Sequence, residues 1–173
     1  MKVLLAIDGS PPSAAAVAHV AQRSWPADTE VKVLTVIHPA MPLLPDPAFA
    51  IAAIHVEQAE ELRRQAPMLL GTACEQIRRG APNVTVILSM VDGVPKDVIV
   101  QEARAWGADL IVVGSHGHGR MWSMVLGSVA RAVLADAPCS VLVARARHVA
   151  PGTESAAGQS SHAVPEHVSN RSN

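Results

Sequence analysis

Short runs of apolar residues recur along the chain and are separated by longer segments in which apolar residues return every three or four positions. Apolar runs that are rich in β-branched residues and bounded by Gly, Pro or polar residues are typical of buried strands. The pattern predicts five strands, the last of them with alternating exposure, at Lys2–Ile7, Val31–Ile37, Val84–Val91, Leu110–Val113 and Ser140–Ala144.

The first helix is expected directly after the first strand and its Asp8-Gly9 turn. Ser10 can cap the free amides at a helix start, and Pro11 is tolerated at the first helical position. The spacing predicts that this helix ends before Trp25 and buries one face, made of Ala14, Val17, Ala18 and Ala21.

Three further segments have helical spacing and predict helices over Ile54–Arg79, Pro95–Trp106 and Ser128–Ala135. The longest contains Pro67, which predicts either a kink or a division of the helix. Gly80 and Gly107 follow two of these segments and are expected to act as C-caps.

Strands and helices alternate almost throughout, which favours a parallel sheet covered on both faces by right-handed crossovers. We therefore predict a doubly wound α/β fold in a single domain over residues 1–147. Residues 148–173 are rich in Ser, Ala, His, Pro, Gly and Asn without an apolar period, and this composition predicts a disordered C-terminal tail.

Composition narrows the function classes. Up to residue 147 the chain has 13 Lys plus Arg and 13 Asp plus Glu, so the predicted domain lacks the basic field that nucleic acids select. Aromatic residues make up only 2% of the chain, so platforms for stacking bases are nearly absent. Nucleic acid is therefore not an expected partner.

The cysteines and the hydropathy of the chain help to predict its cellular location. Cys74 and Cys139 form no CxxC pair and lie in apolar surroundings that predict buried thiols, which suits a reducing environment. The apolar run before Asp8 is too short for a signal peptide core, and no stretch reaches the roughly 20 apolar residues of a membrane span. We expect a cytoplasmic protein that makes no membrane contact.

The segment after the fourth predicted strand is rich in glycine and leads into a helix. It runs from Gly114 to Ser128 with further glycines at 117, 119 and 127. Glycines let backbone amides approach phosphate oxygens, and a helix start adds unsatisfied donors with the positive end of the helix dipole. The alternative is that the glycines only turn the chain, and the residues alone do not decide between the two. Neither a Walker loop nor a GxGxxG motif opening the first strand–helix unit is present.

The spacing Gly114-x-x-Gly117, nine residues, Gly127-Ser128 resembles the ATP-binding signature of the universal stress protein family. The context agrees, with Ala-Ile-Asp8-Gly-Ser at the end of the first strand and Ala137-Pro-Cys-Ser-Val-Leu-Val after the loop. The resemblance covers roughly residues 1–146. It implies the strand order 3-2-1-4-5 and a nucleotide at the carboxyl ends of strands one and four, where the switch-point rule also places a ligand.

The resemblance also implies roles for single residues. Asp8 would contact the ribose or a phosphate-bound Mg²⁺, and the main chain near Val36 would recognise the adenine edge. Gly114 and His116 would line the ribose. The ATP-binding set that the resemblance implies is Ala6, Ile7, Asp8, Val36, Val113, Gly114, His116, Gly117, Gly127, Ser128 and Val129, with the last four holding phosphates.

Several of these residues have plainer interpretations that the sequence leaves open. Asp8 could serve only as a turn or helix-capping residue, and Ser128 could simply cap its helix. His116 and His118 form a His-x-His pair, but no third ligand with suitable spacing follows, so we interpret both as solvated and expect no protein-built metal site. Arg120 is interpreted as a hydrated loop residue.

Two surfaces are candidates for association. The last strand, with Val141–Val143, would form a sheet edge, and members of the family commonly dimerise there, so a homodimer is expected. The alternative is an edge protected by the tail or by Arg145 and Arg147. The proline-rich segment 39–50 could form a patch for an unidentified protein partner, a flap over the nucleotide, or part of the domain's own packing.

Three functions are compatible with these observations. The first is an ATP-binding regulatory or stress-response protein with little or no catalysis, because no nucleophile, general base or Arg-rich cluster is evident. The second is a slow Mg²⁺-dependent ATPase in which Asp8 positions the metal and His116 or Arg120 stabilises the γ-phosphate. The third is an interaction protein that holds no nucleotide.

Overall fold

The computed structural model describes residues 1–38, 49–117 and 126–146 and shows strands and helices in regular alternation. The predictions for residues 39–48, for His118 and Arg120, and for the tail lie outside the described residues. The elements of the described chain are β1 (Lys2–Ala6), α1 (Pro11–Gln22), β2 (Glu30–Ile37), α2 (Phe49–Gly80), β3 (Thr85–Asp92), α3 (Pro95–Trp106), β4 (Leu110–Gly114), α4 (Ser128–Asp136) and β5 (Ser140–Ala144).

The strands form one parallel sheet in the order β3-β2-β1-β4-β5, which confirms the predicted class and topology. The central strand β1 pairs with β2 on one side and with β4 on the other. Its Val3, Leu4 and Leu5 are all completely buried, because both faces of a doubly wound sheet are covered. The strand order reverses beside β1, so the carboxyl ends of β1 and β4 flank the switch point.

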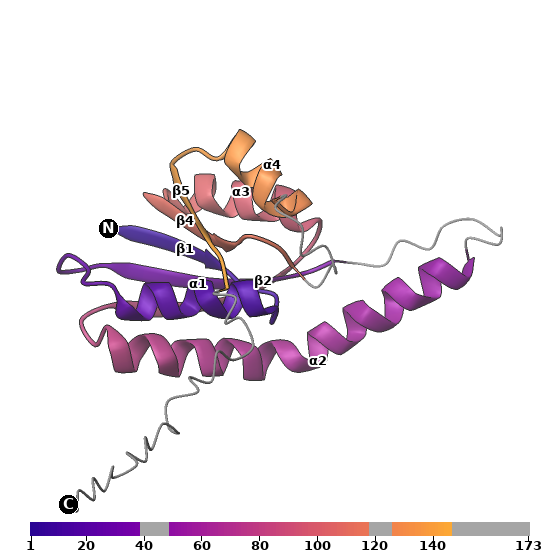
Figure 1. Cartoon of the computed structure of the whole chain (residues 1–173), viewed down its shortest axis with the longest axis horizontal. Coiled ribbons are helices and arrows are strands. Elements are labelled where there is room, and N and C mark those ends of the chain that lie inside the picture. Colours follow the sequence, from indigo (N-terminus) through magenta and orange to yellow (C-terminus); the bar gives the residue numbers. More distant parts are fainter. Residues whose placement is uncertain (39–48, 118–125, 147–173) are drawn as a thin grey trace, which may run out of the picture.

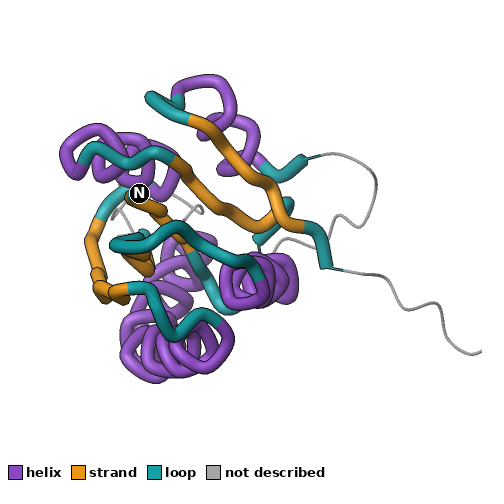
Figure 2. The backbone as a smooth tube through the Cα atoms, turned by 90° about the vertical axis from the view of Figure 1, so that its left-hand side faces the viewer, coloured by secondary structure: helices purple, strands orange, loops and turns teal. Residues whose placement is uncertain are grey.

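Helices cover both faces of the sheet (Figures 1 and 2). Helices α1 and α2 pack on one face, where Val17 and Ile77 meet Val33 in the first core cluster. Helices α3 and α4 cover the other face, where Ile99 and Val133 belong to the second cluster. Successive side chains of each strand therefore serve different cores.

Helix α1 starts as predicted, and its buried face overlaps the predicted face only in part. Ser10 is its N-cap, and the Ser10 Oγ accepts a hydrogen bond from the backbone N–H of Ser13. The predicted face was partly wrong, because Ala14 is exposed and Ala18 only half-buried. The residues that are buried in the helix are Ser13, Ala16, Val17, Val20 and Ala21.

Helix α2 is longer than predicted and remains undivided at Pro67. Figure 1 shows it bending part-way along its length, as expected where a proline ring clashes with the carbonyl one turn earlier. Its last residue, Gly80, was predicted to be a C-cap, but the structure requires glycine there because of a close helix contact. A Cβ at this position would lie 2.3 Å from the carbonyl oxygen of Ala21, so glycine permits α1 and α2 to approach closely. Gly107 is a left-handed C-cap of α3, as predicted.

The last strand departs from the predicted alternation. Ser140 is exposed, the next three residues are half-buried and Ala144 is buried. This gradient arises because β5 lies at the sheet edge and has a neighbour on one side only within the described chain. The cysteine prediction was also only half right: Cys74 is buried, whereas Cys139 is half-buried. Burial raises the pKa of the Cys139 thiol, and the negative charge of Asp109 adds to this effect.

None of the helices in the described ranges combines the length and the apolar character needed to cross a membrane.

Thr35 in β2 is a buried polar side chain whose replacement should stabilise the fold. It is completely buried, and its Oγ1 has no hydrogen-bond partner among the described residues. An unpaired hydroxyl costs free energy in the core, so Thr35→Val, which keeps the shape, should raise the free energy of unfolding by about 1 kcal/mol. Urea denaturation measures this change.

Thr29 supplies a matched control for that prediction. It is also completely buried, but its hydroxyl donates a hydrogen bond of 2.7 Å to the carbonyl oxygen of Pro26. Thr29→Val should therefore lower the free energy of unfolding by about 1 kcal/mol. Equal effects of the two substitutions would show that the Thr35 hydroxyl is satisfied in solution.

Candidate functional site

A cavity of about 300 Å³ opens at the carboxyl ends of β1 and β4, beside the reversal in strand order. This volume is at the lower end of the range for small-molecule pockets, roughly 300 to 1,000 Å³. The walls come from the ends of three strands, the first turns of three helices and the start of the glycine-rich loop. The lining residues are Ala6, Ile7, Asp8, Ser13, Val36, Pro95, Ile99, Val113, Gly114, His116, Gly117, Ser128, Val129 and Ala130.

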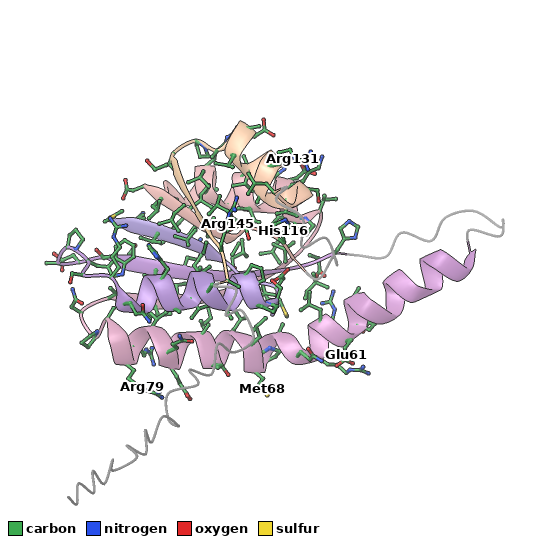
Figure 3. The ribbon with its side chains drawn as sticks, viewed as in Figure 1. Glu61, Met68, Arg79, His116, Arg131 and Arg145 are labelled. Carbon is green, nitrogen blue, oxygen red and sulfur yellow. The ribbon has the colours of Figure 1, made fainter. Side chains whose placement is uncertain are left out.

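All the sequence-predicted site residues except Gly127 line this cavity. They come from segments far apart in the chain, because parallel strands place their carboxyl ends at one edge of the sheet. Figure 3 shows His116 at this edge, with Arg131 of α4 above it. Gly127 is not one of the lining residues, and its assignment to phosphate binding stays a prediction.

Four lining residues were missed by the sequence analysis: Ser13, Pro95, Ile99 and Ala130. Each lies in the first or second turn of α1, α3 or α4. A helix that follows a parallel strand begins at the strand's carboxyl edge, so its first turns face the switch point. That topological rule was the signal that could have found Pro95 and Ile99.

Asp8 follows β1 and is oriented by its own turn. Its Oδ1 accepts a hydrogen bond of 3.0 Å from the Ser10 N–H and one of 2.6 Å from the Ser10 Oγ. Its Oδ2 faces the glycine-rich loop, where a Cβ at Gly117 would lie only 2.7 Å away. The loop backbone therefore approaches the carboxylate as closely as only a glycine allows.

The two ends of the glycine-rich segment meet. The N–H of Gly127 donates to the carbonyl oxygen of Ser115 at 2.9 Å, and the N–H of Ser115 donates to Ala144 in β5 at 2.7 Å. A Cβ at Gly127 would lie 3.2 Å from the His116 Cα. Gly114 is closer still to its neighbours, because its Cβ would lie 2.8 Å from the backbone of Pro12 and Ser13. Close packing of the backbone therefore favours glycine at positions 114 and 127, whether or not a phosphate binds there.

Helix α4 presents its first turn to the cavity. Gly127 is its N-cap, so the interpretation of Ser128 as the cap was wrong, and no side chain of the described residues caps the helix with a hydrogen bond. The amides of the first helical residues have no intrahelical acceptor, and Ser128, Val129 and Ala130 all line the cavity. Uncapped amides at the positive end of a helix dipole form a binding site for an anion.

The remaining walls are mainly apolar. Val36, Ile99 and Val113 belong to the second core cluster and expose part of their surface to the cavity. Asp8 and His116 are the ionisable residues among the described lining, and the His116 Nδ1 lies 3.2 Å from the Ser115 Oγ. In the described chain, no three His, Cys, Asp or Glu side chains gather in a way that could hold a metal ion. The arrangement suits a ligand with a flat apolar part and an anionic part.

Residues 1–145 match the sequence profile of the universal stress protein family. The chain belongs to this family. A universal stress protein of Thermus aquaticus, from the 3′ region of a sulfhydrylase gene, is 33% identical over 144 residues, which is 83% of this chain and 97% of the relative. The matched residues include all the residues that line the cavity.

Solved structures agree with this assignment. The structure of hypothetical protein MJ0577 is 25% identical, with a TM-score of 0.66 over 84% of this chain and 96% of the other. A universal stress protein family member of Arabidopsis thaliana, solved with AMP bound, shares the fold at 19% identity, with a TM-score of 0.55 over 86% and 93% of the two chains.

Proposed function

We propose that this universal stress protein binds ATP in the cavity at the ends of β1 and β4 and acts as a nucleotide-dependent regulatory module with little or no catalysis. The observation that carries the proposal is the first turn of α4, which has no side-chain cap among the described residues and lines the same cavity as Asp8. The lack of a side chain at Gly117 lets the loop backbone lie close to that carboxylate, so that both could contact one ligand. An AMP-bound protein of the same fold supports an adenine nucleotide as the ligand class.

The adenine would lie against the apolar wall. Val36, Pro95 and Ile99 line the part of the cavity nearest α3 and β2 and offer no charge to a ligand. A purine ring needs such an apolar slot, with its edge recognised by backbone groups. The main chain of β2 ends beside this wall at Ile37, so the backbone near Val36 is in a position to recognise the adenine edge.

The ribose and phosphates would span from Asp8 to α4. The carboxylate of Asp8 can accept hydrogen bonds from ribose hydroxyls or hold Mg²⁺ that accompanies the phosphates. Gly114, His116 and Gly117 form the loop side of this path, and Ser128 and Val129 supply donors at its far end. Mg²⁺ would offset the repulsion between the phosphates and Asp8.

Nucleotide binding would act on other proteins through an association surface at the edge strand β5. Strand β5 is an edge strand, and its Val141, Leu142 and Val143 are half-buried. The N–H of Ser115 at the loop start bonds to Ala144 in β5, which links the nucleotide loop to that edge. We infer a cytoplasmic homodimer that pairs through β5 and reports nucleotide occupancy to a protein partner.

Calorimetric titration with ATP and Mg²⁺, followed by chromatography of the bound nucleotide after an hour, tests this function. We expect stoichiometric binding with the ATP intact. Accumulation of ADP would instead assign a slow ATPase, and no heat of binding would leave an interaction protein that holds no nucleotide.

A charge variant at the start of α4 sharpens the experiment. Ser128 is exposed at the first helical position, where an aspartate is favourable for the helix dipole. Ser128→Asp should therefore keep the fold but weaken ATP binding at least about tenfold, because its carboxylate competes for the amides and repels phosphates. Ser140→Asp, which adds the same charge to an exposed position at the start of β5, is the matched control and should bind ATP normally.

A further inference from the structure

Ser10 combines complete burial with contacts to three separate segments. Its side chain has no solvent exposure, and it is not one of the residues that line the cavity. Its Oγ accepts a hydrogen bond from the Ser13 N–H at 3.3 Å, which caps α1. A capping role alone would leave the hydroxyl proton without a specified acceptor.

The Ser10 hydroxyl donates this proton in a hydrogen bond to the Asp8 carboxylate. The Ser10 Oγ lies 2.6 Å from the Asp8 Oδ1, within the range of a hydrogen bond strengthened by a charged acceptor. The backbone N–H of Ser10 donates to the same oxygen at 3.0 Å. Two donors from one residue therefore fix Oδ1 within the turn and direct Oδ2 toward Gly117.

The same hydroxyl also adjoins the glycine-rich loop. The Ser10 Oγ lies 3.3 Å from the carbonyl oxygen of His116, the residue before Gly117. A hydroxyl has one proton, and the shorter contact to the charged Asp8 is the stronger of the two. Ser10 thus lies between the carboxylate and the loop backbone that approaches it.

We propose that Ser10 is a positioning residue of the nucleotide site, which holds the Asp8 carboxylate toward the ribose and the phosphate-bound metal without touching the ligand. The inference rests on the proposed function and assigns the orientation of Asp8 to a buried side chain outside the cavity. Without the hydroxyl, Asp8 loses its shortest hydrogen bond in this turn, so the carboxylate is held less firmly. The ligand must then order the carboxylate when it binds, which lowers affinity.

A ligand-free measurement tests the positioning itself. We would compare amide spectra of ¹⁵N-labelled wild-type protein with those of Ser10→Ala, Asp8→Ala and Thr29→Val. Thr29→Val is the matched control, because it also removes a buried side-chain hydrogen bond but lies at the other end of the sheet. We expect Ser10→Ala to shift the Gly117 amide resonance in the same direction as Asp8→Ala but to add almost no further shift in the Asp8→Ala background, whereas loss of the contact between the Ser10 Oγ and the His116 carbonyl oxygen would by itself shift the resonance in both backgrounds. Thr29→Val should leave it unchanged. An unchanged Gly117 resonance in Ser10→Ala would overturn the inference.

Nucleotide titrations of the same variants show whether the effect passes through Asp8. In the wild-type background, Ser10→Ala should weaken binding of ATP with Mg²⁺ about tenfold, the loss expected when one strong hydrogen bond no longer orders an essential ligand group. In the Asp8→Ala background the same change should have almost no further effect, whereas a general loosening of the loop would weaken both backgrounds equally. An equal loss in both backgrounds would overturn the positioning role. Failure of the wild-type protein to bind would instead refute the proposed function, while the Gly117 resonance would still decide whether Ser10 orients Asp8.

Discussion

Replacement of Gly80 by alanine is expected to destabilise the protein by about 3 kcal/mol, which lowers the melting temperature by roughly 6 to 12 °C. The added Cβ would lie 2.3 Å from the carbonyl oxygen of Ala21 and 3.0 Å from its carbonyl carbon. Backbone atoms of two packed helices cannot yield as a flexible side chain can, so α1 and α2 must separate. Thermal unfolding followed by circular dichroism measures the effect.

Gly71 in the same helix is the control. A Cβ at this position would meet nothing within 4 Å. Gly71→Ala should therefore raise the free energy of unfolding by about 0.5 to 1 kcal/mol, because alanine loses less backbone entropy than glycine in a helix. A loss of stability in Gly80→Ala no larger than about 0.5 kcal/mol would contradict the close helix contact.

Replacement of Gly117 by alanine is expected to weaken ATP binding at least about tenfold while the stability changes little. The added Cβ would lie 2.7 Å from the Asp8 Oδ2, and the other Asp8 atom nearby, the carboxyl carbon, is 3.9 Å away. Because the clash is with the end of a side chain and not with backbone, the Asp8 carboxylate can turn aside and relieve it, at the cost of part of its hydrogen bonding to Ser10. That rotation removes the carboxylate from the ligand's path, so affinity falls although the fold persists.

Two measurements on this variant separate the possible outcomes. Isothermal calorimetry gives the ATP affinity, and urea denaturation gives the free energy of unfolding. Gly71 lies in α2 and is not one of the cavity-lining residues, so Gly71→Ala should bind ATP like the wild type. Wild-type affinity in Gly117→Ala would show that Asp8 does not contact the nucleotide.

The strands and most helix boundaries could be predicted because their signals are local. Pro95 and Gly107 bracket α3, and its predicted bounds are those observed. The buried face of α1 could not be predicted in the same way. Its sequence, Pro-Pro-Ser-Ala-Ala-Ala-Val-Ala-His-Val-Ala-Gln, places alanines on every side, so the face that is buried depends on where the sheet and α2 lie. Gly80 is a similar case, because its requirement comes from a neighbouring helix.

The residues of the candidate site likewise fall into those that the sequence predicts and those that depend on the tertiary fold. The residues at the ends of β1 and β4, among them Asp8, Gly114 and Gly117, were predicted because a motif and a topological rule coincide there. Pro95 and Ile99 were missed, because they enter the cavity only through the crossover that carries α3 to this edge of the sheet. The buried link from Ser10 to Asp8 could not be derived from spacing, since the same residues also form an ordinary helix cap.

We propose that an adenine nucleotide occupies the cavity at the carboxyl ends of β1 and β4. Titration of ¹⁵N-labelled protein with ATP and Mg²⁺, monitored by amide resonances, tests it residue by residue. We expect the largest shifts at Gly117, Ser128 and Val129, with saturation at one nucleotide per chain. Shifts confined to other surfaces, or no shift at these three amides at saturating ATP, would contradict it.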